Sequence, residues 1–189
     1  MLPELDSPIS FKEIDAVINK LTNGKAPGLN GIPPEAEAYK AMNSQTRCRT
    51  HRYVVAFFEG DADYTSWHQS QCIPVPQRGN LSDPNKWHWV MLMDVCSMIF
   101  SSVINGRAFR LLELHGTKFQ FEGTPGLGCQ DGLFTINTLI SAHKNHHLPS
   151  FIAFVDLVKA YNTVNHNLLL RILKKYGAPP KLVASIQTM

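Results

Sequence analysis

The feature that most constrains the fold is a run of five apolar residues, from Phe151 to Val155, that ends at Asp156. A short run of β-branched and aromatic residues is typical of a buried strand. Such a strand would carry Asp156 at its end, and a buried carboxylate has to be paired, hydrogen-bonded or bound to a metal ion. Two interpretations of Asp156 follow from the residues alone: a structural or helix-capping aspartate, and a metal ligand.

Helical patterns dominate the rest of the chain. Ser10 and Glu13 form a capping box at the start of an amphipathic helix that runs to about Leu21. Asp131 can cap a later helix. Further helices are predicted over residues 34–42, 44–58, 94–114 and 166–176. This order of helices around few strands predicts an α+β fold, not a regular βαβ repeat.

Two segments are predicted as a shaped loop and a hairpin. Residues 25–34 (KAPGLNGIPP) contain too much Gly and Pro for a helix or an inner strand. Residues 72–76 (CIPVP) favour an extended stretch at a sheet edge, because each proline removes a backbone donor. The following residues, 77–80 (QRGN), favour a tight turn, which places Arg78 at a hairpin tip. A glycine-rich loop is predicted over residues 123–132.

Composition places the chain among soluble globular proteins, since 189 residues with 44% apolar content can form one domain with a core. The first ten residues lack the basic start and apolar run of a secretory signal, and no stretch approaches about 18 apolar residues. We therefore expect an intracellular protein of the cytoplasm or nucleus that is not secreted and has no membrane contact. The four cysteines fit no zinc or CxxC spacing and are predicted to be free thiols.

A net charge of +3 permits nucleic-acid binding without requiring it. Residues 44–53 and 171–181 are locally basic. These two clusters are either solvated helix faces or contacts to nucleic acid. The histidines within residues 143–147 have no acid or thiol nearby and are interpreted as a solvated helix end.

Four segments, taken in order along the chain, resemble the reverse transcriptase domain of non-LTR (LINE-type) retrotransposons. They are LTNGKAPGLNGIPPE (residues 21–35), IPVPQRGNLSDPNKWHWVMLMDVCSMIFSSVINGRAF (73–109), FQFEGTPGLGCQDGLFTINTLI (119–140) and FIAFVDLVKAYNTVNHNLLL (151–170). The resemblance implies a partial right-hand polymerase, helix-rich and with an incomplete palm sheet. Residues 1–189 would then be a single domain fragment. About 1–150 would form the fingers and early palm, and 151–189 the first catalytic palm strand and the helices after it.

The resemblance also implies roles for four residues. Asp156 matches the catalytic aspartate that binds the magnesium ions of phosphoryl transfer. Tyr161 matches the aromatic residue beneath the sugar of an incoming deoxynucleotide, with a packed core aromatic as the alternative. Arg78 matches a basic residue of the fingers hairpin that contacts the triphosphate. His88 stands where the family has an arginine, and a mostly neutral imidazole cannot copy that rigid fork of donors. Other matched positions have also lost a charged residue of the family: Gln77, Asn80, Met98 and Asn162.

The implied activity is RNA-directed DNA polymerase, a nucleotidyltransferase, with magnesium as cofactor and an RNA template, an RNA–DNA hybrid and deoxynucleotides as partners. The sequence contains no Tyr-x-Asp-Asp motif and no adjacent pair of aspartates. One carboxylate cannot hold two magnesium ions against water, so we expect the isolated chain to be inactive. The alternatives are a nucleic-acid-binding module and a non-functional interaction fragment of a degenerate element. An unpaired palm strand would also permit self-association.

Overall fold

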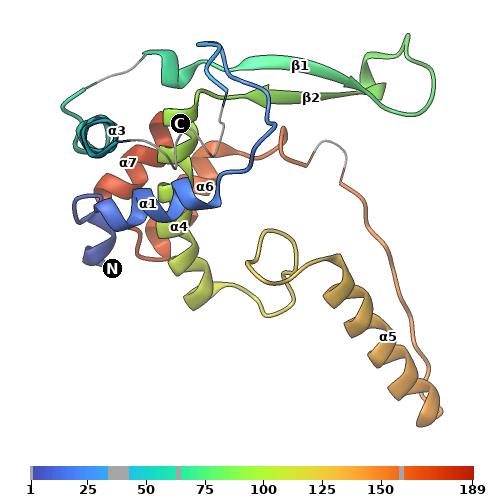
Figure 1. Ribbon diagram of the computed structural model, residues 1–189. Helices are drawn as coiled ribbons and strands as arrows, with labels where there is room; N and C mark the ends of the chain where they lie inside the picture. The colour runs from blue at the N-terminus through green and yellow to red at the C-terminus, as the bar shows by residue number, and fades with distance from the viewer. Residues whose placement is uncertain (1, 34–42, 63–64, 158–159) are drawn as a thin grey trace.

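The computed structural model describes residues 2–33, 43–62, 65–157 and 160–189. In these residues the α-helices are α1 (Phe11–Lys20), α3 (Ser44–Glu59), α4 (Val95–His115), α5 (Cys129–Asn145), α6 (His166–Lys175) and α7 (Pro180–Thr188). The strands are β1 (Gln71–Pro76) and β2 (Trp87–Leu92), and short 3-10 turns cover Pro3–Asp6, Thr65–His68 and Pro84–Lys86. Figure 1 shows a helical body, a hairpin across one end of it, and α5 extending away as an arm. The predicted helix-rich α+β class with an incomplete sheet is confirmed.

Helix α4 runs through the centre of the core. Its buried apolar side chains recur every three or four residues, as a helix packed on one face requires: Val95, Ile99, Phe100, Val103, Ile104 and Leu111. They pack in one cluster with buried residues of α1, α3 and α7. The helix predicted over 94–114 is therefore confirmed. Leu114 lies in the last turn of α4, past the buried cluster, and is exposed.

The two ends of the chain meet on this body. The carboxylate of Asp6 accepts hydrogen bonds from the backbone N–H groups of Lys181 (3.0 Å) and Leu182 (2.9 Å) in the first turn of α7. Those N–H groups have no partner inside their own helix, and a carboxylate at a helix N-terminus also complements the helix dipole. Asp6 therefore caps α7 from more than 170 residues away in the sequence.

The hairpin forms where the prolines predicted an edge. β1 and β2 pair antiparallel, from Gln71 opposite Leu92 to Pro76 opposite Trp87. Pro74 and Pro76 supply no backbone donor, so β1 is suited to an outer position. The extended stretch is confirmed. The predicted tight turn is not: residues 77–80 begin a longer connection, residues 77–86, so Arg78 lies just after β1 and not at a hairpin tip. The sequence did not mark β2 as a strand.

The predicted loop after α1 docks on the start of α4. A Cβ at Gly28 would lie 2.6 Å from the backbone nitrogen of Asp94, closer than atoms can pack, so only glycine fits there. The N–H of Asn30 donates to Oδ1 of Asp94 at 3.2 Å. Asp94 is buried, and this contact supplies its carboxylate with a donor. The glycine is thus required by a close approach between two backbones.

The buried strand predicted at Phe151–Val155 is wrong. Residues 151–157 have no regular secondary structure, and Phe151 and Phe154 are 95% and 85% exposed. A strand requires a neighbouring backbone to satisfy its N–H and C=O groups, and no described segment pairs with this one. In Figure 1 it runs from the far end of α5 back towards α6.

Helix α5 begins at Cys129, so the last residues of the predicted glycine-rich loop belong to the helix. Asp131 accepts a hydrogen bond from the backbone N–H of Gly128 at 2.8 Å, and so caps the helix from within its first turn. None of the residues of α5 is buried. The helices predicted at 44–58 and 166–176 are confirmed by α3 and α6, and the one predicted at 34–42 lies outside the described residues. Within the described ranges, no helix combines the length and apolar character needed to cross a membrane.

Candidate functional site

The hairpin carries two of the four predicted site residues. Arg78 lies in the connection between β1 and β2 and is exposed. The connection is ordered by its own hydrogen bonds, with the Ser82 N–H donating to Oδ1 of Asn80 (3.0 Å) and the Gln77 N–H donating to the Lys86 carbonyl (2.8 Å). The Lys86 side chain lies beside Gly79, so a second cation is close to the turn. The turn therefore presents positive charge to solvent.

His88 lies on β2, opposite Val75, and its side chain is exposed. It is one pair away from the end of the ladder that leads into the turn of Arg78. The hairpin therefore holds both residues at the same end of one rigid ribbon. The other two predicted site residues lie after α5, on a different part of the chain.

Asp156 and Tyr161 lie on either side of residues 158–159, and both are exposed, Tyr161 by 83%. This exposure rules out the packed core aromatic that was the alternative for Tyr161. It also rules out a buried structural role for Asp156. Across the described residues, no group of three or more His, Cys, Asp or Glu side chains could hold a metal ion. Asp156 is therefore not part of a cluster of three or more possible metal ligands among the described residues.

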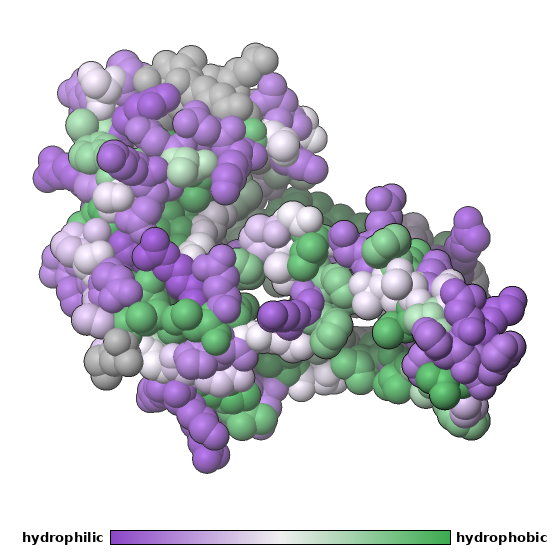
Figure 2. Space-filling model, turned by 90° about the horizontal axis from the view of Figure 1, so that it is seen from below, coloured by the Kyte–Doolittle hydropathy of each residue, from purple (hydrophilic) through white to green (hydrophobic). Residues whose placement is uncertain are grey.

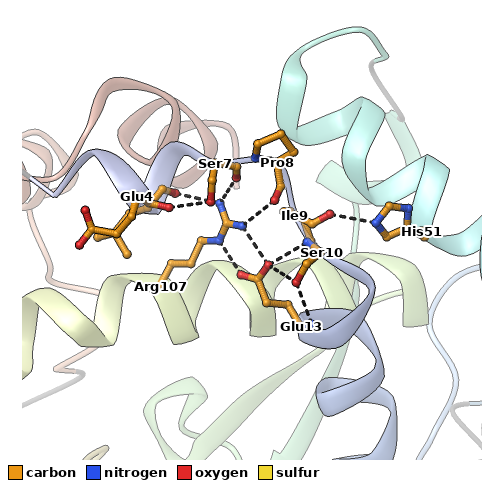
Figure 3. Close-up of polar contacts among 9 residues, drawn as sticks. Glu4, Ser7, Pro8, Ile9, Ser10, Glu13, His51 and Arg107 are labelled. Atoms are coloured by element: carbon orange, nitrogen blue, oxygen red, sulfur yellow. Dashed lines mark hydrogen bonds and ion pairs between the residues drawn. The ribbon is translucent and has the colours of Figure 1, made fainter.

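The most highly connected polar residue is one that sequence reasoning missed. Arg107 on α4 is 5% exposed, and its guanidinium donates to both carboxylate oxygens of Glu13, through Nε (2.8 Å) and Nη2 (3.0 Å). Nη1 also donates to the backbone carbonyls of Leu5 (2.8 Å) and Ser7 (2.7 Å), as Figure 3 shows. The guanidinium carbon lies 5.0 Å from the ring centre of Phe58. Arg107 therefore ties the N-terminal segment to α4 and to α3.

The sequence did contain a signal for this residue. Arg107 lies four residues after Val103 and four before Leu111, in the middle of the buried stripe of α4. An arginine at such a position is buried unless the helix is interrupted, and a buried arginine needs acceptors. The predicted capping-box Glu13 is one of them.

The electrostatics of Glu13 reflect this pairing. Burial alone would raise the pKa of the carboxyl group, but hydrogen bonds from Arg107 and Ser10 and the charge of Arg107 outweigh it, so the pKa lies below its usual 4.5. The same carboxylate accepts from the Ser10 N–H at 2.8 Å, which completes the capping box. Nearby, the ring of His51 contacts the Ile9 carbonyl at 2.9 Å (Figure 3). The same ring stacks on Phe11, with ring centroids 3.8 Å apart. This cluster joins α1, α3 and α4.

The two basic clusters predicted from the sequence lie on helices. On α3, a surface groove of about 360 Å³ is lined by Arg49, Arg52, Tyr53 and Ala56. Arg47 of the same helix is paired with Asp15 at 3.1 Å. On α6 and just after it the exposed cations are Arg171, Lys174, Lys175 and Lys181, and Lys181 forms an ion pair with Glu59. Of the two basic surfaces, the one on α3 therefore lines a groove.

The four cysteines are free thiols, as predicted. Cys48, Cys72 and Cys129 are exposed, whereas Cys96 is partly buried at the start of α4. Burial and the nearby Asp94 carboxylate raise the pKa of the Cys96 thiol. Cys96 is therefore the least reactive of the four.

Comparison with known proteins places this α+β body and its hairpin among retroelement proteins. No protein-family model matches the chain. It is 24% identical to the transposon TX1 uncharacterized 149 kDa protein of Xenopus laevis over 185 aligned residues. The alignment covers 98% of this chain and 14% of that protein. It is 23% identical to the retrovirus-related Pol polyprotein from type-1 retrotransposable element R2 of Popillia japonica over 170 aligned residues. The alignment covers 90% of this chain and 22% of the polyprotein.

Both relatives are proteins of non-LTR retrotransposons, and the chain resembles them over almost its whole length. The predicted resemblance to non-LTR retrotransposon proteins is thereby confirmed, and the chain is retroelement-derived. It spans less than a quarter of the length of either relative.

Proposed function

We propose that the chain is the fingers and early-palm segment of a reverse transcriptase, and that its hairpin contacts nucleic-acid or nucleotide phosphates through Arg78. The observation that carries this proposal is the exposed Arg78 in the ordered turn between β1 and β2. The four segments that resemble the family put a triphosphate contact at this position. An arginine is always charged near neutral pH, and its planar fork of donors suits phosphate oxygens.

The neighbouring residues support a contact to phosphate, not to a neutral ligand. Lys86 lies beside the turn and adds a second cation. His88 on the same ribbon adds only a weaker contact, since an imidazole is mostly neutral at pH 7. In this proposal Arg78 and Lys86 supply the attraction, and the hairpin supplies the fixed geometry.

The residues around Asp156 do not fit a magnesium site of the two-ion kind. Magnesium keeps most of its water unless several oxygen ligands converge, and Asp156 belongs to no group of three or more possible metal ligands among the described residues. We therefore propose that Asp156 is an inherited catalytic position and that the isolated chain incorporates no deoxynucleotides. Tyr161 is proposed in the same sense, as an inherited nucleotide-binding position.

A second candidate function is a nucleic-acid-binding module that uses α3. The groove between Arg49, Arg52 and Tyr53 favours it, because it combines two exposed guanidinium groups with an aromatic ring. Single-strand binding typically uses cations that follow the phosphate backbone, together with an aromatic ring on which a base can stack. This surface lies on a different element from the hairpin, so the two candidates can be separated by mutation.

The test is a titration of a fluorescent RNA–DNA hybrid at a series of salt concentrations. Binding through phosphates falls as salt rises, and each lost contact reduces the slope of log K against log salt by about 1. Arg78→Gln should reduce the slope by about that amount, whereas Arg110→Gln, an exposed arginine on α4, should leave it unchanged. If Arg49→Gln and Arg52→Gln reduce the slope and Arg78→Gln does not, α3 is the binding surface. If the unmodified chain does not bind at low salt, both proposals fail.

A further inference from the structure

The segment formed by residues 151–157 (FIAFVDL) is the most exposed apolar stretch of the described chain. Phe151, Phe154 and Val155 are each more than 80% exposed, and Leu157 is 70% exposed. No residue of the segment forms a hydrogen bond with another described residue. Both edges of this extended backbone are therefore without partners in the described chain.

Strand β1 is protected against pairing with a second chain. β1 carries Pro74 and Pro76, which remove donors from its backbone. Segment 151–157 contains no proline, no glycine and one charged residue, Asp156. Short segments of high β-propensity and low charge are those that pair between chains.

We propose that this segment pairs with the same segment of a second copy of the chain, antiparallel and with Phe154 opposite Phe154. In this register Phe151 lies opposite Leu157, and Ile152 lies opposite Asp156 of the other copy. Side chains alternate between faces, so one face of the ribbon consists of Phe151, Ala153, Val155 and Leu157 and is entirely apolar. The two-fold axis passes through the Phe154 pair, which makes the contact closed and self-complementary.

Charge selects the antiparallel orientation. A parallel pair in register would place the two Asp156 carboxylates side by side, about 4.8 Å apart, where like charges destabilise the ladder. The antiparallel register separates them by about 14 Å, four residues along the strand. It also brings each Asp156 towards the basic end of the other copy's α5, because the His143 ring lies 2.9 Å from the Ser150 hydroxyl, just before the segment.

The exposed area is sufficient for a stable dimer. A two-stranded ribbon is marginal alone and needs a covering layer, which the unburied apolar residues of α5 can supply: Leu133, Phe134 and Leu139. The segment and these residues together expose roughly 900 Å² per copy, taking about 200 Å² for a fully exposed phenylalanine. Standard interfaces bury about 800 Å² per partner. Figure 2 shows hydrophobic surface next to the hydrophilic end of the arm.

The first test is the molar mass of the whole chain in solution without nucleic acid, measured by light scattering after size exclusion. The unmodified chain should be a dimer, and Phe154→Asp should halve the mass, because it places two carboxylates opposite each other at the axis. Phe119→Asp is the matched control, since Phe119 is 72% exposed on a loop outside the segment, and this variant should remain dimeric. A monomeric unmodified chain, open-ended aggregates, or equal dissociation by both variants would overturn the proposal.

The second test fixes the register by disulfide cross-linking with oxidised glutathione, after Cys48, Cys72 and Cys129 are changed to serine. A disulfide requires Cα atoms within about 7 Å. Phe154→Cys should cross-link two copies, because residues directly opposite are about 5 Å apart. Ile152→Cys should not, because its two copies are about 14 Å apart in this register. Equal cross-linking of both variants would indicate parallel pairing and overturn the register.

Discussion

Replacement of Arg107 by alanine tests how the N-terminal segment is held on the body. The guanidinium group is buried, donates to both oxygens of Glu13 and to the carbonyls of Leu5 and Ser7, and contacts the Phe58 ring. Its removal leaves a half-buried carboxylate and two carbonyl groups without their donor. The variant should therefore lose far more stability than a surface mutation would.

The magnitude follows from these contacts. Breaking a buried ion pair by removing one partner costs about 3–5 kcal/mol. The Glu13 side chain is 34% exposed and keeps some water, which places the expected loss near the lower end, at about 3 kcal/mol. For a chain of this size each kcal/mol lowers Tm by about 2–4 °C, so the expected change is roughly 6–12 °C.

Urea denaturation followed by circular dichroism measures this loss. Arg110→Ala, an exposed arginine one turn further along α4, is the matched control and should change the free energy of unfolding by less than about 0.5 kcal/mol. Arg107→Lys should lie between the two, because an ammonium group keeps the charge but cannot reach all the acceptors of the guanidinium fork. If Arg107→Ala costs no more than Arg110→Ala, the assignment of Arg107 as the central tie of the N-terminal segment is refuted.

Four further predictions concern other residues of the body. Since the pKa of Glu13 is lowered in the folded state, the free energy of unfolding should fall as pH drops below about 4.5. Urea denaturation between about pH 6 and pH 3 should show a weaker dependence of this free energy on pH for Glu13→Gln than for the unmodified chain. Gly28→Ala should lower Tm, at a cost of about 1–3 kcal/mol, because its Cβ meets the backbone of Asp94. Gly106→Ala, in open space within α4, should raise Tm, with a gain of about 0.5–1 kcal/mol. A thiol reagent should label three cysteines rapidly and Cys96 slowly; equal rates for all four would contradict the burial of Cys96.

Local patterns in the sequence predicted the elements whose stability is local. The capping box at Ser10 and Glu13 forms as expected, because its hydrogen bonds join residues three apart. The prolines at 74 and 76 predicted an edge strand, since a missing N–H acts at the residue itself. The helix from Val95 followed from its apolar spacing.

The remaining differences depend on partners that are distant in sequence. A run such as Phe151–Val155 becomes a strand only if another backbone lies beside it, and that is not encoded within the run itself. The position of Arg107 in the apolar stripe of α4 indicates burial, but its acceptors could be identified only once α1 and the N-terminal segment were known to lie against α4. In the candidate site, the exposed position of Arg78 could be predicted from the local residues that connect the two strands. The neighbours of Asp156 could not be predicted in this way, because they depend on residues far along the chain.

The most direct test of the central claim is primer extension on an RNA template with magnesium and deoxynucleotides, comparing the unmodified chain with Asp156→Ala. We expect that neither protein extends the primer, and that both bind the hybrid in a salt-sensitive way that depends on Arg78. Extension by the unmodified chain that Asp156→Ala abolishes would contradict this expectation, because the missing metal ligands would then have to come from a second chain.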